Sequence, residues 1–146
     1  MNVPYLDLKP QRQAVEAEIN ERFRGIMDSC QFIMGEAVGL CEEKLKSFTG
    51  APYAVTAGSG TDALIMALMA AGIGPGDKVI TTAFSFFATA ETIVAVGAIP
   101  VFVDIEPDTY NIDVQAIEEQ MGPDVKAIMP VSLYGQVANM LSLIHI

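Results

Sequence analysis

Positive charge is scarce in this sequence. Its 146 residues contain eight Lys and Arg against eighteen Asp and Glu, which gives a formal net charge of -10 at pH 7. A surface with this charge repels polyanions. The composition therefore excludes a protein that binds nucleic acid through a basic face.

Long apolar runs are absent as well. The longest run, from Ala63 to Gly74, has 12 residues, whereas a membrane-spanning helix needs roughly 20. An apolar content of 51% is enough for a globular core and argues against disorder. We therefore expect this run to form a buried core helix.

Cysteine and histidine are few. The chain has two cysteines, Cys30 and Cys41, and one histidine, His145. Neither a CxxC pair nor a second histidine is present, so no metal site is expected. Residues 1–7 show no basic segment followed by an apolar one, which predicts a cytoplasmic location. In that setting two partly buried free thiols are favoured over a disulfide.

Two amphipathic helices are predicted before Gly50, over residues 10–28 and about 37–48. In both, apolar side chains recur every three or four positions, which places them on one helix face. They are Val15, Ile19, Phe23 and Ile26 in the first helix and Val38, Cys41 and Leu45 in the second.

After Gly50, short β-branched runs alternate with helical stretches. The expected strands are 53–56, 79–82, 101–103 and 127–131, and the expected helices are 61–71, 88–96 and 114–121. This alternation is typical of βαβ crossovers. It predicts an α/β fold with a mainly parallel sheet and helices on both faces.

The densest acidic stretch, Asp104 to Asp113, has two interpretations. Oxygen-bearing side chains at alternate positions are typical of a calcium loop, but Thr109 stands where such a loop needs glycine and the closing glutamate is out of register. We favour a solvated connection in which Asp113 caps the next helix.

The turn from Thr56 to Leu64 carries the strongest signal for a ligand. It is rich in small residues and connects a predicted strand with a helix. Helix N-termini bind anions through free amides and the helix dipole, and the hydroxyl groups of Ser59 and Thr61 add donors. The turn therefore predicts a phosphate site. The alternative is that Ser59 or Thr61 only caps the helix.

A dinucleotide site is the weaker interpretation of the same turn. Gly58, Gly60 and Ala63 match the G-x-G-x-x-A spacing, but that motif needs an acidic residue at the end of the next strand to bind a ribose. Residues 79–90 contain no acidic residue. Asp62 is unfavourable next to any phosphate unless its side chain turns away.

Three aromatic residues, Phe84, Phe86 and Phe87, follow the second predicted strand. Ligands of open α/β sheets bind beyond the carboxyl ends of the strands. One ring is therefore placed to stack on a planar cofactor whose phosphate lies at residues 59–61. The other two rings are expected to pack in the core.

Several motifs in a fixed order resemble those of one known family. They are Tyr5–Lys9, Gly58–Leu64, Gly72–Thr82, Ala88–Glu91, Gly97–Ile105 and Pro130–Gln136. In this combination the sequence, from residue 3 to about residue 140, resembles the DegT/DnrJ/EryC1/StrS family of pyridoxal-phosphate-dependent sugar aminotransferases.

The resemblance implies the three-layer large domain of a fold type I aminotransferase, present in part, in a homodimer with active sites at the subunit interface. Members transfer an amino group, usually from glutamate, to a ketone on a nucleotide-linked sugar in amino-sugar biosynthesis. By position, Gly60, Thr61 and Asp62 would bind the phosphate of pyridoxal 5'-phosphate, and Phe86 would stack on its ring. Ser132 replaces a histidine found in many members and is given no catalytic role.

The family's cofactor-binding lysine, and the aspartate that holds the pyridine nitrogen, lie beyond the Tyr-Gly-Gln segment. The five lysines of this chain stand at other positions: Lys9, Lys44, Lys46, Lys78 and Lys126. The resemblance therefore implies an N-terminal fragment without a catalytic residue of its own, which we expect to be inactive alone.

The expected parts of the chain are a helical segment at 1–50, the first part of the cofactor-binding domain at 51–140, and a tail at 141–146 that leaves the family pattern. Two alternatives to an aminotransferase stay open. One is a dehydratase of the same family, in which histidine replaces the lysine. The other is a non-catalytic nucleotide-binding α/β module.

Overall fold

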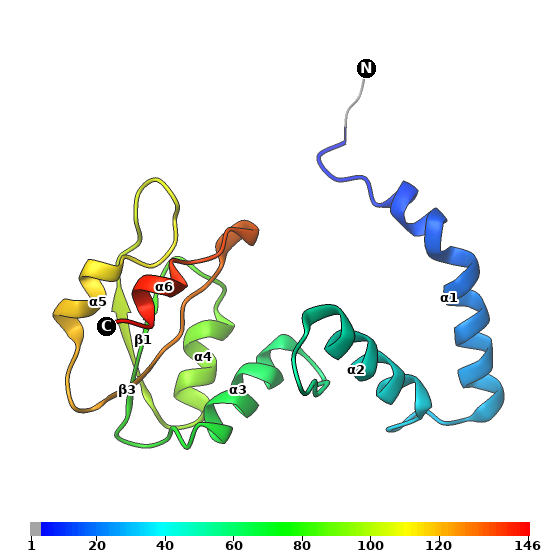
Figure 1. Cartoon of the computed structure of the whole chain (residues 1–146), viewed down its shortest axis with the longest axis horizontal. Coiled ribbons are helices and arrows are strands. Elements are labelled where there is room, and N and C mark those ends of the chain that lie inside the picture. Colours follow the sequence, from blue (N-terminus) through cyan, green and yellow to red (C-terminus); the bar gives the residue numbers. More distant parts are fainter. Residues whose placement is uncertain (1–3) are drawn as a thin grey trace. The chain divides into compact units, whose positions relative to one another are not determined.

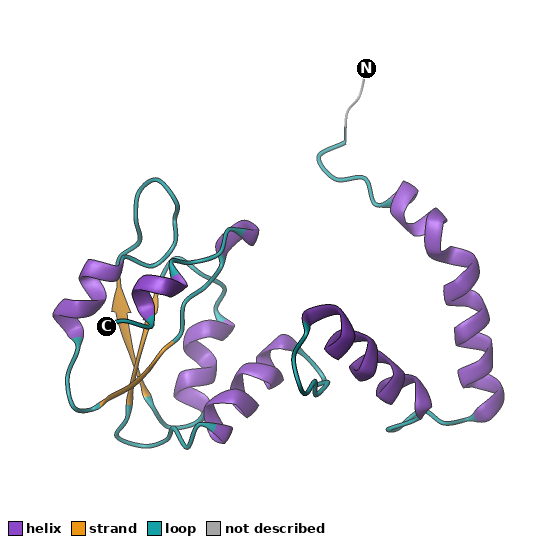
Figure 2. Cartoon of the chain, in the orientation of Figure 1, coloured by secondary structure: helices purple, strands orange, loops and turns teal. Residues whose placement is uncertain are grey.

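The computed structural model describes residues 4–146, which form two compact units, residues 4–56 and residues 57–146. Figure 1 labels the helices and strands, and Figure 2 colours them by type. The three strands found among residues 4–146 all belong to the second unit. Residues 1–3, the start of the predicted segment 1–50, lie outside the described residues.

The first unit consists of two helices, α1 (Lys9–Ser29) and α2 (Glu36–Thr49), which confirms both predicted helices. Pro10 lies in the first turn of α1, where proline is well tolerated. Gly50 ends α2 in the left-handed conformation, at φ 73°. None of the described residues of this unit is buried.

The apolar faces of α1 and α2 are therefore exposed within their own unit. Ile19 and Phe23 of α1 are 56% and 59% exposed. Cys41, predicted to face inward on α2, is exposed, as is Cys30. The expectation of partly buried thiols is wrong, because two helices without a third layer cannot enclose a side chain.

The predicted strand at residues 53–56 is also wrong. None of the three strands pairs with this segment, and β propensity produces a strand only where a neighbour supplies hydrogen bonds. Instead the amide and the hydroxyl of Thr56 both donate to Glu42 Oε1, each over 2.9 Å. These bonds, the amide bond first, lower the pKa of Glu42.

The second unit alternates helices with parallel strands. Its elements are α3 (Gly60–Ala70), β1 (Lys78–Thr82), α4 (Ala88–Ala95), β2 (Ile99–Val103), α5 (Val114–Gln120), β3 (Val125–Ile128), the 3-10 helix η1 (Leu133–Gly135) and α6 (Met140–Leu143). The sheet order is β2-β1-β3, and both pairs are parallel, with Ile80 opposite Val101 and Ile128. The predicted α/β fold with a parallel sheet is confirmed.

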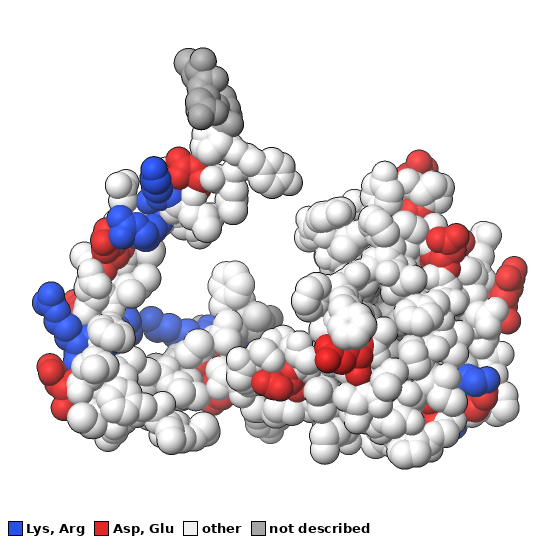
Figure 3. All heavy atoms as spheres, turned by 180° about the vertical axis from the view of Figure 1, so that it is seen from behind, with Lys and Arg blue, Asp and Glu red and all other residues white. Residues whose placement is uncertain are grey.

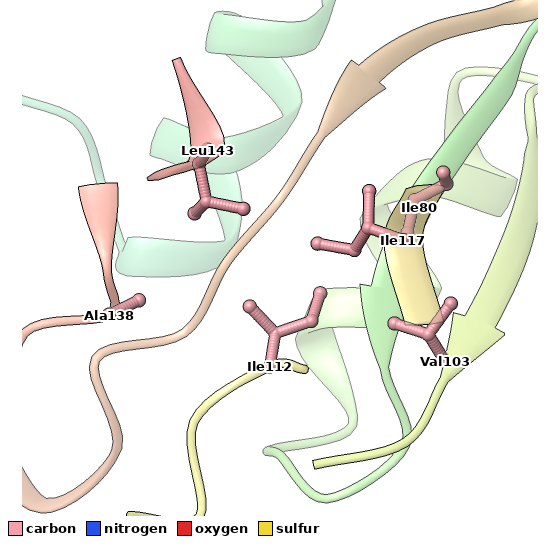
Figure 4. Close-up of a cluster of buried hydrophobic side chains, with 6 residues drawn as sticks. All are labelled: Ile80, Val103, Ile112, Ile117, Ala138 and Leu143. Carbon is pink, nitrogen blue, oxygen red and sulfur yellow. The ribbon is translucent and has the colours of Figure 1, made fainter. Parts of the chain in front are cut away.

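Each face of this sheet carries a core cluster, because adjacent residues of a strand point to opposite faces. Val79 and Ile80 of β1 are both fully buried. The cluster around Val79 contains Leu68, Ile73, Val79, Ile93 and Ala98. The cluster around Ile80, drawn in Figure 4, contains Ile80, Val103, Ile112, Ile117, Ala138 and Leu143. Helices α3 and α4 thus cover one face and α5 and α6 the other, which confirms the three layers.

Helix α3 corrects the expectation of a buried core helix. Leu68 is its one buried residue, whereas Met66 and Met69 are 47% and 65% exposed. One side of α3 packs against α4, and no described residue of the second unit encloses the other side. Within residues 4–146, no helix combines the length and the apolarity needed to cross a bilayer.

The helices α3 and α4 end in the same type of turn, a Schellman motif with glycine in the left-handed region. The bonds are Gly72 N–H to Met69 O and Ile73 N–H to Leu68 O in α3, and Gly97 N–H to Val94 O and Ala98 N–H to Ile93 O in α4. Gly72 and Gly97 have φ of 72° and 83°. The two turns are in contact, since a Cβ at position 97 would lie 2.9 Å from Pro75 Cγ.

Candidate functional site

Several loops of the second unit lie at one edge of the sheet. Because the strands are parallel, the segments that follow them, 83–87, 104–113 and 129–137, all leave the carboxyl edge. The short turn 71–77 reverses the chain between α3 and β1, which places the N-terminus of α3 toward the same edge (Figure 1). Ligands of open α/β sheets bind at this edge.

The start of α3 has the geometry of a capped helix with two open amides. Ser59 is the N-cap, and its Oγ accepts a hydrogen bond from the amide of Asp62 over 3.1 Å. The Ser59 carbonyl accepts from Ala63. Among residues 4–146, the amides of Gly60 and Thr61 have no acceptor. Capping by Ser59 is thus confirmed, and two N–H groups remain directed outward for an anion.

Two glycines make room around these amides. A Cβ on Gly60 would have no atom within 4 Å, so the approach to the first amide is open. A Cβ on Gly58 would lie 2.8 Å from Asp62 Oδ2, so the carboxylate of Asp62 folds back over Gly58. The amide of Asp62 is engaged by Ser59, so the phosphate contact predicted for Asp62 requires that amide to share its hydrogen.

The three phenylalanines after β1 are all exposed, which overturns the expectation that two of them pack in the core. Phe84, Phe86 and Phe87 are 47%, 79% and 72% exposed. They follow the end of β1, beyond the two sheet faces that Val79 and Ile80 fill. An exposed ring at this edge is free to stack on a planar ligand.

The loop that carries these rings is ordered by its own hydrogen bonds. The amide of Phe84 donates to Thr82 Oγ1 over 3.2 Å, and the hydroxyls of Ser85 and Thr89 lie 2.7 Å apart. The Phe84 ring lies against Tyr110, with centroids 5.8 Å apart and planes at 34°. The Phe86 ring is therefore presented by a loop tied to β1, to α4 and to the segment after β2.

The segment after β2 contains two residues that the motifs did not single out. Tyr110 contacts Phe84, and Asn111 is buried with its carboxamide bonded to the segment 133–137. The predicted solvated connection ends as expected, because Asp113 Oδ1 accepts from the Gln115 amide and caps α5. The one available signal in the sequence is that Asn111 directly precedes Ile112, a β-branched residue that is buried in the core.

Positive charge is absent from this edge in the second unit. Residues 57–146 contain ten acidic and two basic side chains, a net charge of -8, and acidic spheres predominate on the face of this unit in Figure 3. Lys78 is the first residue of β1, and its Nζ lies 2.6 Å from Asp124 Oδ2. This hydrogen bond lowers the pKa of Asp124. The Nζ of Lys126 donates to the Pro123 carbonyl. Both lysines thus lie near the amino ends of strands, so within residues 57–146 the donors available to an anion at α3 are backbone amides and hydroxyl groups rather than basic side chains.

The first unit contains a separate hollow of about 750 Å³ between α1 and α2. Its walls include Ile26, Leu40 and Cys41, and its rim includes the ion pair of Arg22 with Glu18. The hollow holds neither the glycine turn nor the exposed aromatic rings, so it is not the site that the motifs predict.

A sequence profile of the DegT/DnrJ/EryC1/StrS aminotransferase family matches residues 13–146. The chain belongs to this family. The resemblance inferred from the ordered motifs is confirmed, and family members are aminotransferases, which are enzymes.

Two curated relatives match nearly the whole of this chain. The pleiotropic regulatory protein of Geobacillus stearothermophilus is 49% identical over 96% of this chain and 38% of its own length. The UDP-2-acetamido-2-deoxy-3-oxo-D-glucuronate aminotransferase of Pseudomonas aeruginosa is 45% identical over 94% of this chain and 38% of its own length. The DegT-family chain thus spans about 38% of the length of these relatives.

Solved structures of the family agree with the fold. A DegT/DnrJ/EryC1/StrS aminotransferase from Brucella abortus has a TM-score of 0.92 at 36% identity, covering 99% of this chain and 40% of that chain. NtdA from Bacillus subtilis, with the bound cofactor PMP, has a TM-score of 0.89 at 34% identity, covering 97% and 33%. The predicted fold class, part of the large domain of a fold type I aminotransferase, is confirmed.

The carboxyl edge of this DegT-family chain fits a phosphorylated, planar cofactor. The open amides of Gly60 and Thr61 suit the phosphate, because they need no basic side chain. The exposed ring of Phe86 suits the face of a pyridine. The donor set and the open space beside Gly60 thus match the group that the NtdA structure holds.

Proposed function

We propose that the complete protein carrying this chain is a pyridoxal 5'-phosphate-dependent aminotransferase. It transfers an amino group from glutamate to a keto sugar linked to a nucleotide, in amino-sugar biosynthesis. The single observation that supports it most is the pair of open amides at the start of α3, in a chain of the DegT family. The name of the Pseudomonas relative supports a UDP-linked 3-keto sugar as the substrate class.

In that reaction the residues of this chain bind and orient the cofactor. Gly60 and Thr61 hold its phosphate through their amides, and Phe86 covers one face of its ring. Asp62 adds a further contact to the phosphate when its amide hydrogen is shared between Ser59 Oγ and a phosphate oxygen. Pyridoxal phosphate, when bound, supplies the electron sink for amino-group transfer. Ser59 keeps the helix start in place while its neighbours bind.

We also propose that these 146 residues alone are not active. None of the five lysines matches the family's cofactor-binding position, and the two in the second unit lie at the amino ends of strands. The proposal extends to a cytoplasmic homodimer and to the division 1–50, 51–140 and 141–146. The helix α6 spans the last boundary, with Leu143 in the core.

The experiment is turnover by the complete protein, loaded with pyridoxal 5'-phosphate, of UDP-2-acetamido-2-deoxy-3-oxo-D-glucuronate with glutamate. We expect the amino sugar and 2-oxoglutarate in equal amounts. Loss of a hydroxyl from the sugar without transfer of nitrogen would favour the dehydratase, and failure to bind the cofactor would favour a nucleotide-binding module. Turnover by residues 1–146 alone would contradict their proposed inactivity.

Two neighbouring rings provide a matched control for the cofactor site. We expect Phe86→Ala to weaken pyridoxal 5'-phosphate binding about tenfold, the effect of losing roughly 1.4 kcal/mol of stacking. Phe87→Ala removes a ring of similar exposure from the same loop, and it should change the affinity less than about twofold. Equal effects of the two substitutions would refute the role of Phe86.

A further inference from the structure

Asn111 has no part in the proposed binding of the cofactor, yet it is only 4% exposed. Both the nitrogen and the oxygen of its carboxamide form hydrogen bonds. Its Nδ2 donates to the carbonyls of Gln136 and Val137, each over 3.3 Å. Its Oδ1 accepts from the amide of Leu133 over 3.4 Å. One carboxamide thus clamps both ends of the segment 133–137, which follows β3 at the carboxyl edge.

The clamp is built on fixed neighbours. Ile112 and Ala138, which adjoin the two bonded segments, lie in the same core cluster and are 2% and 3% exposed (Figure 4). The Asn111 amide donates to Thr109 Oγ1 over 3.2 Å, and that hydroxyl donates to Glu106 Oε2 over 2.8 Å. Asn111 is therefore held from the core and from its own loop.

The clamped segment presents Tyr134 in an unusual backbone conformation. Tyr134 has φ 53° and Gly135 has φ 85°, so two successive residues are left-handed. This region is unfavourable for tyrosine, and such residues persist where their surroundings hold them, often beside ligands. The Tyr134 side chain is 87% exposed. Its ring offers an apolar face and its hydroxyl a hydrogen bond, a pairing that suits a sugar.

We propose that Asn111 is a positioning residue for the substrate and that Tyr134 is the contact it positions. By holding the segment 133–137, Asn111 fixes Tyr134 at the carboxyl edge, where Tyr134 packs against the sugar of the nucleotide-linked substrate. This inference rests on the proposed function. It adds a substrate contact on the segment after β3 to the cofactor contacts at α3 and at Phe86.

The first test compares three variants in the complete protein with UDP-2-acetamido-2-deoxy-3-oxo-D-glucuronate. Asn111→Ala and Tyr134→Ala should each raise KM about tenfold and leave kcat within about twofold, and the double variant should be no worse than either. Asn139→Ala is the control, because Asn139 also accepts from a backbone amide, that of Ser142, but lies outside the clamp. Its KM should not change.

The second test does not depend on turnover. In Asn111→Ala, hydrogen exchange at the Leu133 amide should accelerate about tenfold relative to the unmodified protein, and Asn139→Ala should not alter it. Unchanged exchange at Leu133 overturns the clamp. Unchanged KM in Tyr134→Ala overturns the substrate contact, since loss of this exposed side chain does not threaten folding.

The two tests separate this inference from the function on which it rests. If the unmodified protein binds pyridoxal 5'-phosphate but does not turn over the sugar, the proposed substrate is wrong and the Tyr134 contact with it falls. The exchange rate at Leu133 still decides whether Asn111 holds the segment. If the unmodified protein turns over the sugar normally and Asn111→Ala and Tyr134→Ala both behave like the control, the positioning role and the Tyr134 contact are wrong and the proposed function stands.

Discussion

The two units of this chain are stabilised in opposite ways. Residues 4–56 fold into helices without one buried side chain, whereas residues 57–146 enclose a core on each face of a parallel sheet. Their charges differ too: six basic and eight acidic side chains in the first unit, two and ten in the second. The comparison teaches that the candidate site stands on the unit with the buried cores, and that the anion site proposed there depends on open backbone amides rather than on net charge.

The largest expected effect separates the two units by their cores. Ile93→Ala removes a fully buried side chain and should lower the free energy of unfolding of the second unit by about 2–5 kcal/mol. Ile19→Ala, on the exposed face of α1, should cost less than about 1 kcal/mol. Urea unfolding followed by circular dichroism measures both. Equal losses would mean that the first unit has a core of its own.

A pair of glycines tests the turns. Gly97→Ala should destabilise the second unit by about 1–3 kcal/mol, because position 97 has φ 83° and a Cβ there would lie 2.9 Å from Pro75 Cγ. Gly39→Ala, in open space within α2, should stabilise that helix by roughly 0.5–1 kcal/mol. Thermal melting curves of the two variants should move in opposite directions, and a shared direction would refute the account of the turns.

Removal of the cap at the site should have a moderate effect. Ser59→Ala deletes the acceptor for the Asp62 amide and should cost about 1 kcal/mol of stability. Ser29→Ala, whose hydroxyl donates to Ile26 at the end of α1, is the matched control with an effect below about 0.5 kcal/mol. Hydrogen exchange of the amides of α3 and of α1 measures the local stability of each helix in its variant. Unchanged exchange rates in α3 of Ser59→Ala would show that the cap is dispensable.

The smallest expected effect is the pH response of the first unit. The Thr56 bonds lower the folded-state pKa of Glu42 from its ordinary value of 4.5, so the stabilisation is complete above that value. It should disappear as the pH falls from there through the lowered pKa. Exchange of the Thr56 amide should therefore accelerate on acidification. In Glu42→Gln that acid dependence should vanish, and its persistence would contradict the assignment.

Elements with a strong local signal could be predicted from the sequence. The 3.6-residue spacing in α1, the glycines after α3 and α4, and the cap residues Ser59 and Asp113 act on their own neighbours, and the structure contains each of them. The glycine-rich turn before α3 is also recognisable from its local sequence. The cofactor contacts expected at Gly60, Thr61, Asp62 and Phe86 remain predictions.

Features that depend on distant partners could not be predicted. Residues 53–56 have the composition of a strand, but none of the strands described in residues 4–146 pairs with them, and the phenylalanines after β1 are apolar yet lie beyond the sheet faces. The clamp of Asn111 joins segments about 22 to 26 positions apart, which no local pattern encodes. Burial and long-range hydrogen bonds are properties of the fold, and composition specifies them only loosely.

The central claim is that an anion binds at the start of α3. The most direct measurement is a titration of the complete protein, labelled with ¹⁵N in glycine and threonine, with pyridoxal 5'-phosphate and with pyridoxal, which lacks the phosphate. We predict that the phosphate shifts the amide resonances of Gly60 and Thr61 and leaves Gly74 and Gly76, in the turn at the amino end of β1, unchanged. Shifts confined to Gly74 and Gly76, or none at Gly60 and Thr61, would contradict the claim.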